Sequence, residues 1–138
     1  MSIETGLFTH LTTDANVSAI VDARVYPLRL MQGYTLPALT YQRISTERKP
    51  TLSGPNERVV GRFQINCFAA TYSAARALAD KVRISLDGRK GTLGSEDDVG
   101  GISIQGEWED DDQQTDVYRI MLDFRIPYTE LNINNIGD

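Results

Sequence analysis

An apolar stripe at helical spacing, placed between two segments of alternating apolar residues, is the strongest pattern in this sequence. Apolar and mostly polar residues alternate from Val59 to Ala69 and again from Tyr118 to Tyr128. A period of two is typical of a strand with one buried face, whereas a period of about 3.6 is typical of an amphipathic helix. Each element has one apolar side, so the helix must pack against a sheet. The stripe consists of Ala75, Leu78, Ala79, Val82 and Leu86.

The boundaries of this helix can also be predicted. Thr71 or Ser73 can cap its first turn, because a hydroxyl oxygen accepts a hydrogen bond from an amide that has no partner within the helix. Gly88 follows Leu86 and can adopt the left-handed conformation in which many helices end. We therefore expect a helix over residues 73–86.

Two hairpins should flank this helix in the chain. The segment Pro37–Ser45 is rich in β-branched and aromatic residues, and we expect it to pair with Val59–Ala69. The connection Thr46–Arg58 carries prolines, a glycine and several charges, which predicts an exposed loop. Ile102–Trp108 alternates as a strand does, and we expect it to pair with Tyr118–Tyr128.

Two further segments are predicted to lack regular structure. The acidic run Glu109–Asp112 should form the turn of the second hairpin. Gly88–Gly101 is rich in glycine and carries several acids, which predicts an exposed loop of low order.

The first part of the chain is predicted to be helical. Apolar residues at helical spacing indicate a short helix over Ile3–Leu11, which Thr12–Asp14 should end. Asp14 or Asn16 can cap a second helical turn that reaches Val21. A short extended segment, Arg24–Pro27, should follow, because a residue before proline avoids the helical region. The chain should then form a loop around Gln32, Gly33 and Tyr34.

This order of elements predicts an α+β fold with two layers. We expect an antiparallel sheet of about four strands with the helices packed on one face. A chain of 138 residues suits one hydrophobic core, so residues 1–138 should form a single domain. Residues 1–128 would be its core, and residues 129–138 would be a tail that is loose or docked on a neighbour.

Composition argues against several classes of protein. Nineteen acidic and fourteen basic residues give a net charge of −5, which disfavours specific nucleic-acid binding. No apolar run is long enough to cross a membrane, and the first residues do not resemble a secretion signal, so we expect a soluble protein that stays in the cell that makes it. The single cysteine, Cys67, lies in an apolar strand pattern and should be a buried, inert thiol.

The sequence does not predict a catalytic or metal site. The one histidine, His10, lies in the first helix, and no nucleophile signature links it to Cys67. The acids of Glu107–Asp112 lack the spacing of a calcium-binding loop. The glycines of Gly88–Gly94 follow a helix, whereas a phosphate-binding loop precedes one. We therefore expect no catalytic residues, no metal ligands and no cofactor. The aromatic residues of the second hairpin should be core or interface residues: Trp108, Tyr118 and Phe124.

Several strings resemble the tail completion or terminator proteins of long-tailed bacteriophages. They are FQINCFAATYSAARALADKVRISLDG (Phe63–Gly88), YRIMLDFRIPY (Tyr118–Tyr128), RVYP (Arg24–Pro27) and PALTYQRIS (Pro37–Ser45). The resemblance covers nearly the whole chain up to Tyr128. It implies a structural virion protein of the tail and neck, assembled in the cytoplasm of a bacterial host. Such a protein forms a ring, expected to be a hexamer, at the head-proximal end of the tail tube. The ring ends tube polymerisation and joins the tail to the head. Implied partners are further copies of the chain, the major tail tube protein and a head completion or stopper protein.

A ring subunit needs surfaces for its neighbours, and the predicted loops supply the candidates. Arg48, Lys49 and Arg58 belong to one predicted loop, and Arg89 and Lys90 belong to the other. Unpaired sheet edges could serve as well. The alternative is that these loops are merely solvated.

The acidic run has a second possible use. Carboxylates of Glu109, Asp110, Asp111 and Asp112 would repel DNA phosphates if they lined a tube through which DNA passes.

Two other functions stay open at this point. One is a head-bound stopper or adaptor in the same neck. The other is a small cytoplasmic enzyme or ligand-binding domain, because a two-layer α+β fold hosts many activities.

Overall fold

The computed structural model describes residues 3–48, 56–94 and 96–131. Within these ranges the chain forms three helices and seven strands. The helices are α1 (Ile3–Thr13), α2 (Ala15–Val21) and α3 (Tyr72–Leu86). The strands are β1 (Val25–Pro27), β2 (Ala38–Arg48), β3 (Asn56–Ala69), β4 (Gly91–Leu93), β5 (Glu96–Val99), β6 (Ser103–Asp112) and β7 (Val117–Leu131).

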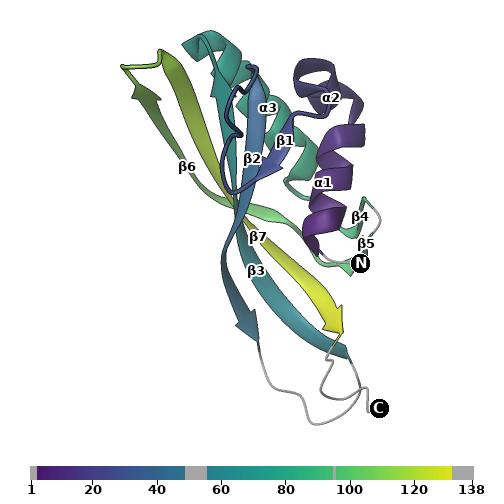
Figure 1. The fold of residues 1–138 in the computed structure, drawn as a ribbon. Coiled ribbons are helices and arrows are strands. Elements are labelled where there is room, and N and C mark those ends of the chain that lie inside the picture. Colours follow the sequence, from purple (N-terminus) through teal and green to yellow (C-terminus); the bar gives the residue numbers. More distant parts are fainter. Residues whose placement is uncertain (1–2, 49–55, 95, 132–138) are drawn as a thin grey trace.

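All seven strands belong to one sheet with the order β1-β2-β3-β7-β5-β4, and β6 pairs with β7 as well. Only β1 and β2 are parallel among the described pairs. The three helices lie on one side of the sheet, and the far ends of β2, β3 and β7 project beyond them (Figure 1). The predicted α+β class, with helices on one face of a mostly antiparallel sheet, is confirmed. The four expected strands correspond to the long ones, and the three short strands are additional.

The core lies between the helices and the alternate residues of the two central strands. Phe63 of β3 stands opposite Phe124 of β7, and both are fully buried. Leu7 of α1 and Leu78 of α3 join the same cluster. Burying each such side chain contributes roughly 1.5–3 kcal/mol. The alternation in the sequence therefore identified the face that the helices cover.

The predicted helix caps are largely confirmed. The Oγ1 atom of Thr71 accepts a hydrogen bond from the amide of Ala74 at 3.2 Å, and Gly88 has a φ of +85°. The carboxylate of Asp14 accepts from the amide of Val17 at 3.1 Å. Helix α1 continues to Thr13 instead of ending at Leu11. The hydroxyls of its last two threonines donate to carbonyl oxygens one turn back, so these residues do not break the helix.

The segment Gly88–Gly101 was predicted to be an exposed loop, and that prediction is wrong. It contains β4 and β5, and the side chains of Leu93 and Val99 are buried. Gly94, with a φ of +58°, lies so close to α1 that a Cβ atom there would be 2.3 Å from the carbonyl oxygen of Gly6. The glycine-rich segment therefore buries two apolar side chains and packs against the first helix.

Two other boundaries differ from prediction. The acidic run Glu109–Asp112 belongs to β6, and the turn of the hairpin follows it at residues 113–116. Both ends of the predicted loop Thr46–Arg58 are also strand, since β2 reaches Arg48 and β3 begins at Asn56, and residues 49–55 lie outside the described residues. In both hairpins the ladder of backbone hydrogen bonds continues beyond the apolar residues, so polar side chains occupy the strand ends.

The described part of the chain ends in β7 at Leu131, so residues 129–131 of the predicted tail continue this strand. Residues 132–138, the rest of that tail, lie outside the described residues. No described helix has the length and apolar character needed to span a membrane.

Candidate subunit and neck interface

His10 and Cys67, the residues considered above as a possible catalytic pair, are both buried. His10 is buried, and its Nε2 donates to the carbonyl oxygen of Ser85 on α3 at 3.1 Å. Burial, and then the positive charge of Arg89, hold the pKa of His10 below its ordinary value. Cys67 is fully buried in β3, and burial raises the pKa of its thiol well above the ordinary value of 9.0. A protonated thiol in the core is a poor nucleophile.

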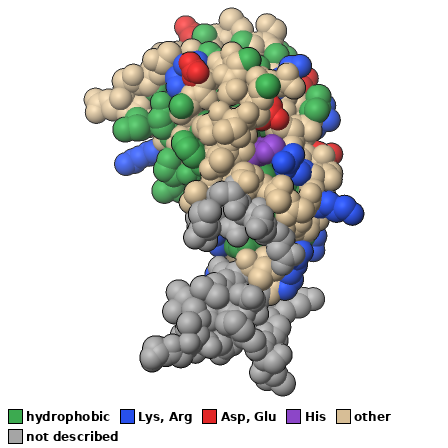
Figure 2. Space-filling view, turned by 90° about the vertical axis from the view of Figure 1, so that its right-hand side faces the viewer, with side chains coloured by type: hydrophobic (Ala, Val, Ile, Leu, Met, Phe, Trp, Pro, Cys, Tyr) green, Lys and Arg blue, Asp and Glu red, His purple; other side chains and the backbone are tan. Residues whose placement is uncertain are grey.

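The described residues hold no group of three histidine, cysteine or acidic side chains placed to bind a metal ion. On the side of the molecule in Figure 2, acidic and basic side chains are interspersed over the upper part, and basic side chains predominate along the lower right edge.

The predicted contact residues fall in two separate regions. Arg48 and Arg58 lie near the ends of β2 and β3, in the part of the sheet that projects beyond the helices. Arg58 donates to the Oγ1 atom of Thr129 at 3.1 Å. Lys49 lies outside the described residues. The other region follows α3, where Arg89 and Lys90 are exposed. Their roles as contacts remain predictions.

The acidic run is more strongly paired than a solvated turn would be. Glu109 accepts hydrogen bonds from the hydroxyl of Tyr72 at 2.7 Å and from Arg76 of α3 at 2.9 Å. Asp110 pairs with Arg119 of β7, and hydrogen bonding to this guanidinium lowers the pKa of Asp110. Because of the alternation along β6, Glu109 faces the helices and Asp110 faces the opposite side.

The remaining two acids of the run lie at the end of β6. Asp112 accepts a hydrogen bond from the backbone amide of Gln114 at 3.0 Å, which fixes the turn. Asp111 and Asp112 are exposed, so most of the unneutralised charge of the run is here. Whether these carboxylates line a DNA passage remains a prediction.

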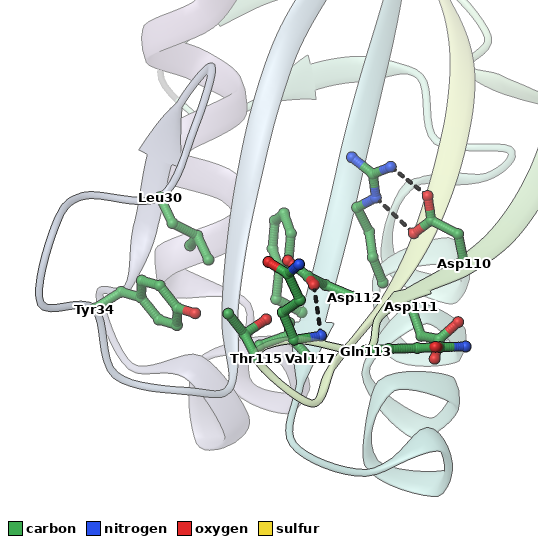
Figure 3. A pocket seen from close by; sticks show the side chains of 11 residues that line it. Leu30, Tyr34, Asp110, Asp111, Asp112, Gln113, Thr115 and Val117 are labelled. Carbon is green, nitrogen blue, oxygen red and sulfur yellow. Dashed lines mark hydrogen bonds and ion pairs between the residues drawn. The ribbon is translucent and has the colours of Figure 1, made fainter.

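These acids form one side of a groove that the sequence did not predict (Figure 3). The groove has a volume of about 660 Å³ and lies on the uncovered side of the sheet, where Phe68, Arg119 and Asp110 stand side by side on three strands. Leu30 and Tyr34 point into it from the loop between β1 and β2. The loop between β1 and β2 contains several apolar residues, whereas a fully solvated loop rarely does. This composition was the sequence signal that could have indicated the groove.

The aromatic residues of the second hairpin divide between core and surface. Phe124 is fully buried, and Tyr118 packs edge to face against Tyr72 with the ring centroids 6.4 Å apart. Trp108 is 51% exposed and lies on the uncovered side of the sheet, opposite Met121. Exposed aromatic side chains of this size are frequent at protein interfaces.

A family model described as "Tail completion protein gp17" matches residues 5–129. No curated protein matches the chain. Among solved structures, a chain from one titled "Virion of native gene transfer agent (GTA) particle" superimposes with a TM-score of 0.70 at 20% sequence identity. The alignment covers 94% of this chain and 96% of the other. At this identity the likeness establishes a shared fold.

Proposed function

Since this chain belongs to the tail completion protein gp17 family and is therefore a structural component of a phage-like virion, we propose that it is a tail terminator. In this role, copies of the chain form a ring at the head-proximal end of the tail tube. The ring ends polymerisation of the tube and joins the tail to the head. The observation that carries the proposal is the family match, which extends over nearly all described residues.

A ring of six copies is the proposed assembly. Its subunits meet head to tail, so each must present two different surfaces to its neighbours. The uncovered side of the sheet, with its groove and exposed Trp108, supports such a role because one face of the domain is left without a covering layer. The projecting ends of β2 and β3, with Arg48 and Arg58, are the proposed surface for proteins above or below the ring.

The proposed partners are the major tail tube protein on one side and a head completion or stopper protein on the other. We propose no catalytic activity. The groove is open and has carboxylates along one side, and neither His10 nor Cys67 lines it. An enzyme or ligand-binding site of the ordinary kind is instead concave, mostly apolar and equipped with converging polar groups.

A head-bound stopper or adaptor is the alternative position in the same neck. Both positions require a small domain with several contact surfaces. They differ in the particle to which the purified chain binds, which makes them separable by experiment.

The test uses tail tubes from a phage mutant that lacks this chain, together with heads from the same mutant. A terminator binds one end of each tube and halts its growth when more tube protein is added. Electron microscopy of tube lengths and light scattering of the free chain measure the two properties. Tubes that keep growing, together with chain bound to heads, would move the assignment to the stopper position. Binding to neither particle would contradict both.

A further inference from the structure

We propose that the groove beside the β6–β7 turn receives the outer face of helix α3 from a second copy of this chain. This contact rests on the proposed ring and specifies which two surfaces join its subunits. The groove and α3 lie on opposite layers of the domain, and their apolar and charged residues are complementary.

The receiving groove combines an apolar wall with an acidic rim. Leu30, Tyr34 and Phe68 provide much of the apolar lining. Asp112 lies on the opposite side of the groove (Figure 3), and Asp111 precedes it at the groove edge with its side chain directed to the helix side of β6. Arg119 also lines the groove, but its charge is balanced by the ion pair with Asp110. The chemistry therefore suits an apolar side chain that is accompanied by cations.

The outer face of α3 has this composition. Ile84 is 64% exposed, although it lies on a helix whose other large aliphatic side chains are buried. Lys81 lies one turn before it and is also exposed. Arg89 and Lys90 follow the helix and are exposed. Asp87 lies at the helix end too, and its Oδ1 accepts a hydrogen bond from the amide of Ile104.

Complementary charge and an exposed apolar residue together point to a second copy as the occupant. The basic residues around Ile84 are opposite in charge to the acidic rim, which favours association and fixes its orientation. Burial of Ile84 against the groove removes an exposed aliphatic side chain from water.

The placement of the two surfaces determines the symmetry of the assembly. The groove is on the uncovered side of the sheet, and α3 covers the other side. Opposite faces of one domain cannot both meet the same partner molecule, so the contact passes from each copy to the next. Such a head-to-tail contact closes into a ring when its rotation permits.

Disulfide trapping tests the contact directly. Ile84→Cys and Thr115→Cys place one thiol on α3 and one at the groove, while the native Cys67 is buried and serves as an internal control. Under mild oxidation the doubly substituted chain should give a ladder of covalent oligomers, in concentrated solution and on capped tail tubes. Equimolar mixing of the two single variants should give dimers only. Each single variant alone should give no cross-linked product.

Charge exchange supplies a second measurement. Lys81→Glu with Lys90→Glu reverses the α3 side, and Asp112→Lys reverses the groove side. Each variant alone should shift the concentration at which oligomers form upward by at least tenfold, as followed by sedimentation. An equimolar mixture should recover assembly, because the two kinds of chain can then alternate. Glu47→Lys, an exposed reversal at the far end of β2, is the matched control and should change little.

The outcomes separate this contact from the proposed terminator role. Absence of cross-linked oligomers both in solution and on tubes, or loss of assembly without recovery on mixing, would overturn the contact. Tubes that remain capped in that case leave the terminator role intact. Cross-linked rings that do not halt tube growth would support the contact and contradict the terminator role.

Discussion

Arg62 of β3 and Asp123 of β7 form an ion pair across the sheet on the side opposite the helices. The Asp123 side chain is only 5% exposed, whereas that of Arg62 is 49% exposed. The second oxygen of Asp123, Oδ1, has no hydrogen-bond partner among the described residues. A buried carboxylate thus depends on one arginine that reaches it from the surface.

This dependence predicts an asymmetry between two variants. Arg62→Met keeps most of the aliphatic stem but leaves the buried carboxylate without its cation, which should lower the free energy of unfolding by about 1–3 kcal/mol. Asp123→Asn removes the buried charge and should cost less than about 1 kcal/mol. Urea denaturation of both variants checks the difference. Equal losses would mean that Asp123 is better solvated than its burial indicates.

Gly94 should tolerate alanine poorly. A Cβ atom there would be 2.3 Å from the carbonyl oxygen of Gly6, and the φ of +58° is unfavourable for a side chain. We expect Gly94→Ala to cost more than about 2 kcal/mol, since strain and displacement of α1 add together. Gly33→Ala is the control, because Gly33 also has a positive φ of +78° but nothing within 4 Å of the added atom. It should cost about 1 kcal/mol in thermal or chemical denaturation.

His10 should make the protein less stable in mild acid. Burial lowers the pKa of His10 in the folded state, so the unfolded chain binds this proton more readily. The free energy of unfolding should therefore fall as the pH drops below about 6.5, by at most about 1.4 kcal/mol per pH unit. His10→Gln can still donate to the carbonyl of Ser85 but does not titrate, and it should flatten the curve between pH 7 and pH 5. An unchanged slope would assign the acid sensitivity to other groups.

Cys67 should react with thiol reagents only when the protein opens. The thiolate is the reactive form, and burial both raises the pKa of Cys67 and blocks access. Alkylation in native buffer should be at least about a hundredfold slower than in denaturant. The exposed thiol of an Ile84→Cys variant is the comparison and should react at once. Fast labelling of the unmodified chain would show that β3 opens locally.

The acidic lumen hypothesis and the α3 contact make different predictions for the same residues. Asp111→Asn with Asp112→Asn should leave assembly normal and slow DNA ejection if the carboxylates face the passing genome. The same pair should instead weaken ring formation if these side chains meet a neighbouring α3. Particle yield and the rate of ejection, measured on the same virions, separate the two. No change in either would contradict both.

The central elements could be predicted from sequence because their apolar residues repeat with a clear period. Helix α3 was expected over residues 73–86 and begins one residue earlier, with Thr71 as its cap. Strands β3 and β7 follow their alternation through Phe63 and Phe124. In these elements, local pattern and burial agree.

The errors share one physical cause, which is that a partner distant in sequence decides the local structure. The acidic run extends as a strand because Arg76 and Arg119 neutralise it from α3 and β7. Residues around Leu93 fold as a hairpin because they can dock on α1, some eighty residues earlier in the chain. The groove combines Tyr34 with the β6–β7 turn, and no local pattern could relate these segments.

Strand β7 pairs with β3, β5 and β6, and all three precede it in the chain. During synthesis these strands emerge from the ribosome before the one strand that joins them. The side of the groove that includes Val117 and Arg119 is therefore missing from a nascent chain until β7 is released. The proposed docking surface is thus incomplete in an unfinished polypeptide, and the proposed contact with neighbouring copies requires that translation has passed β7.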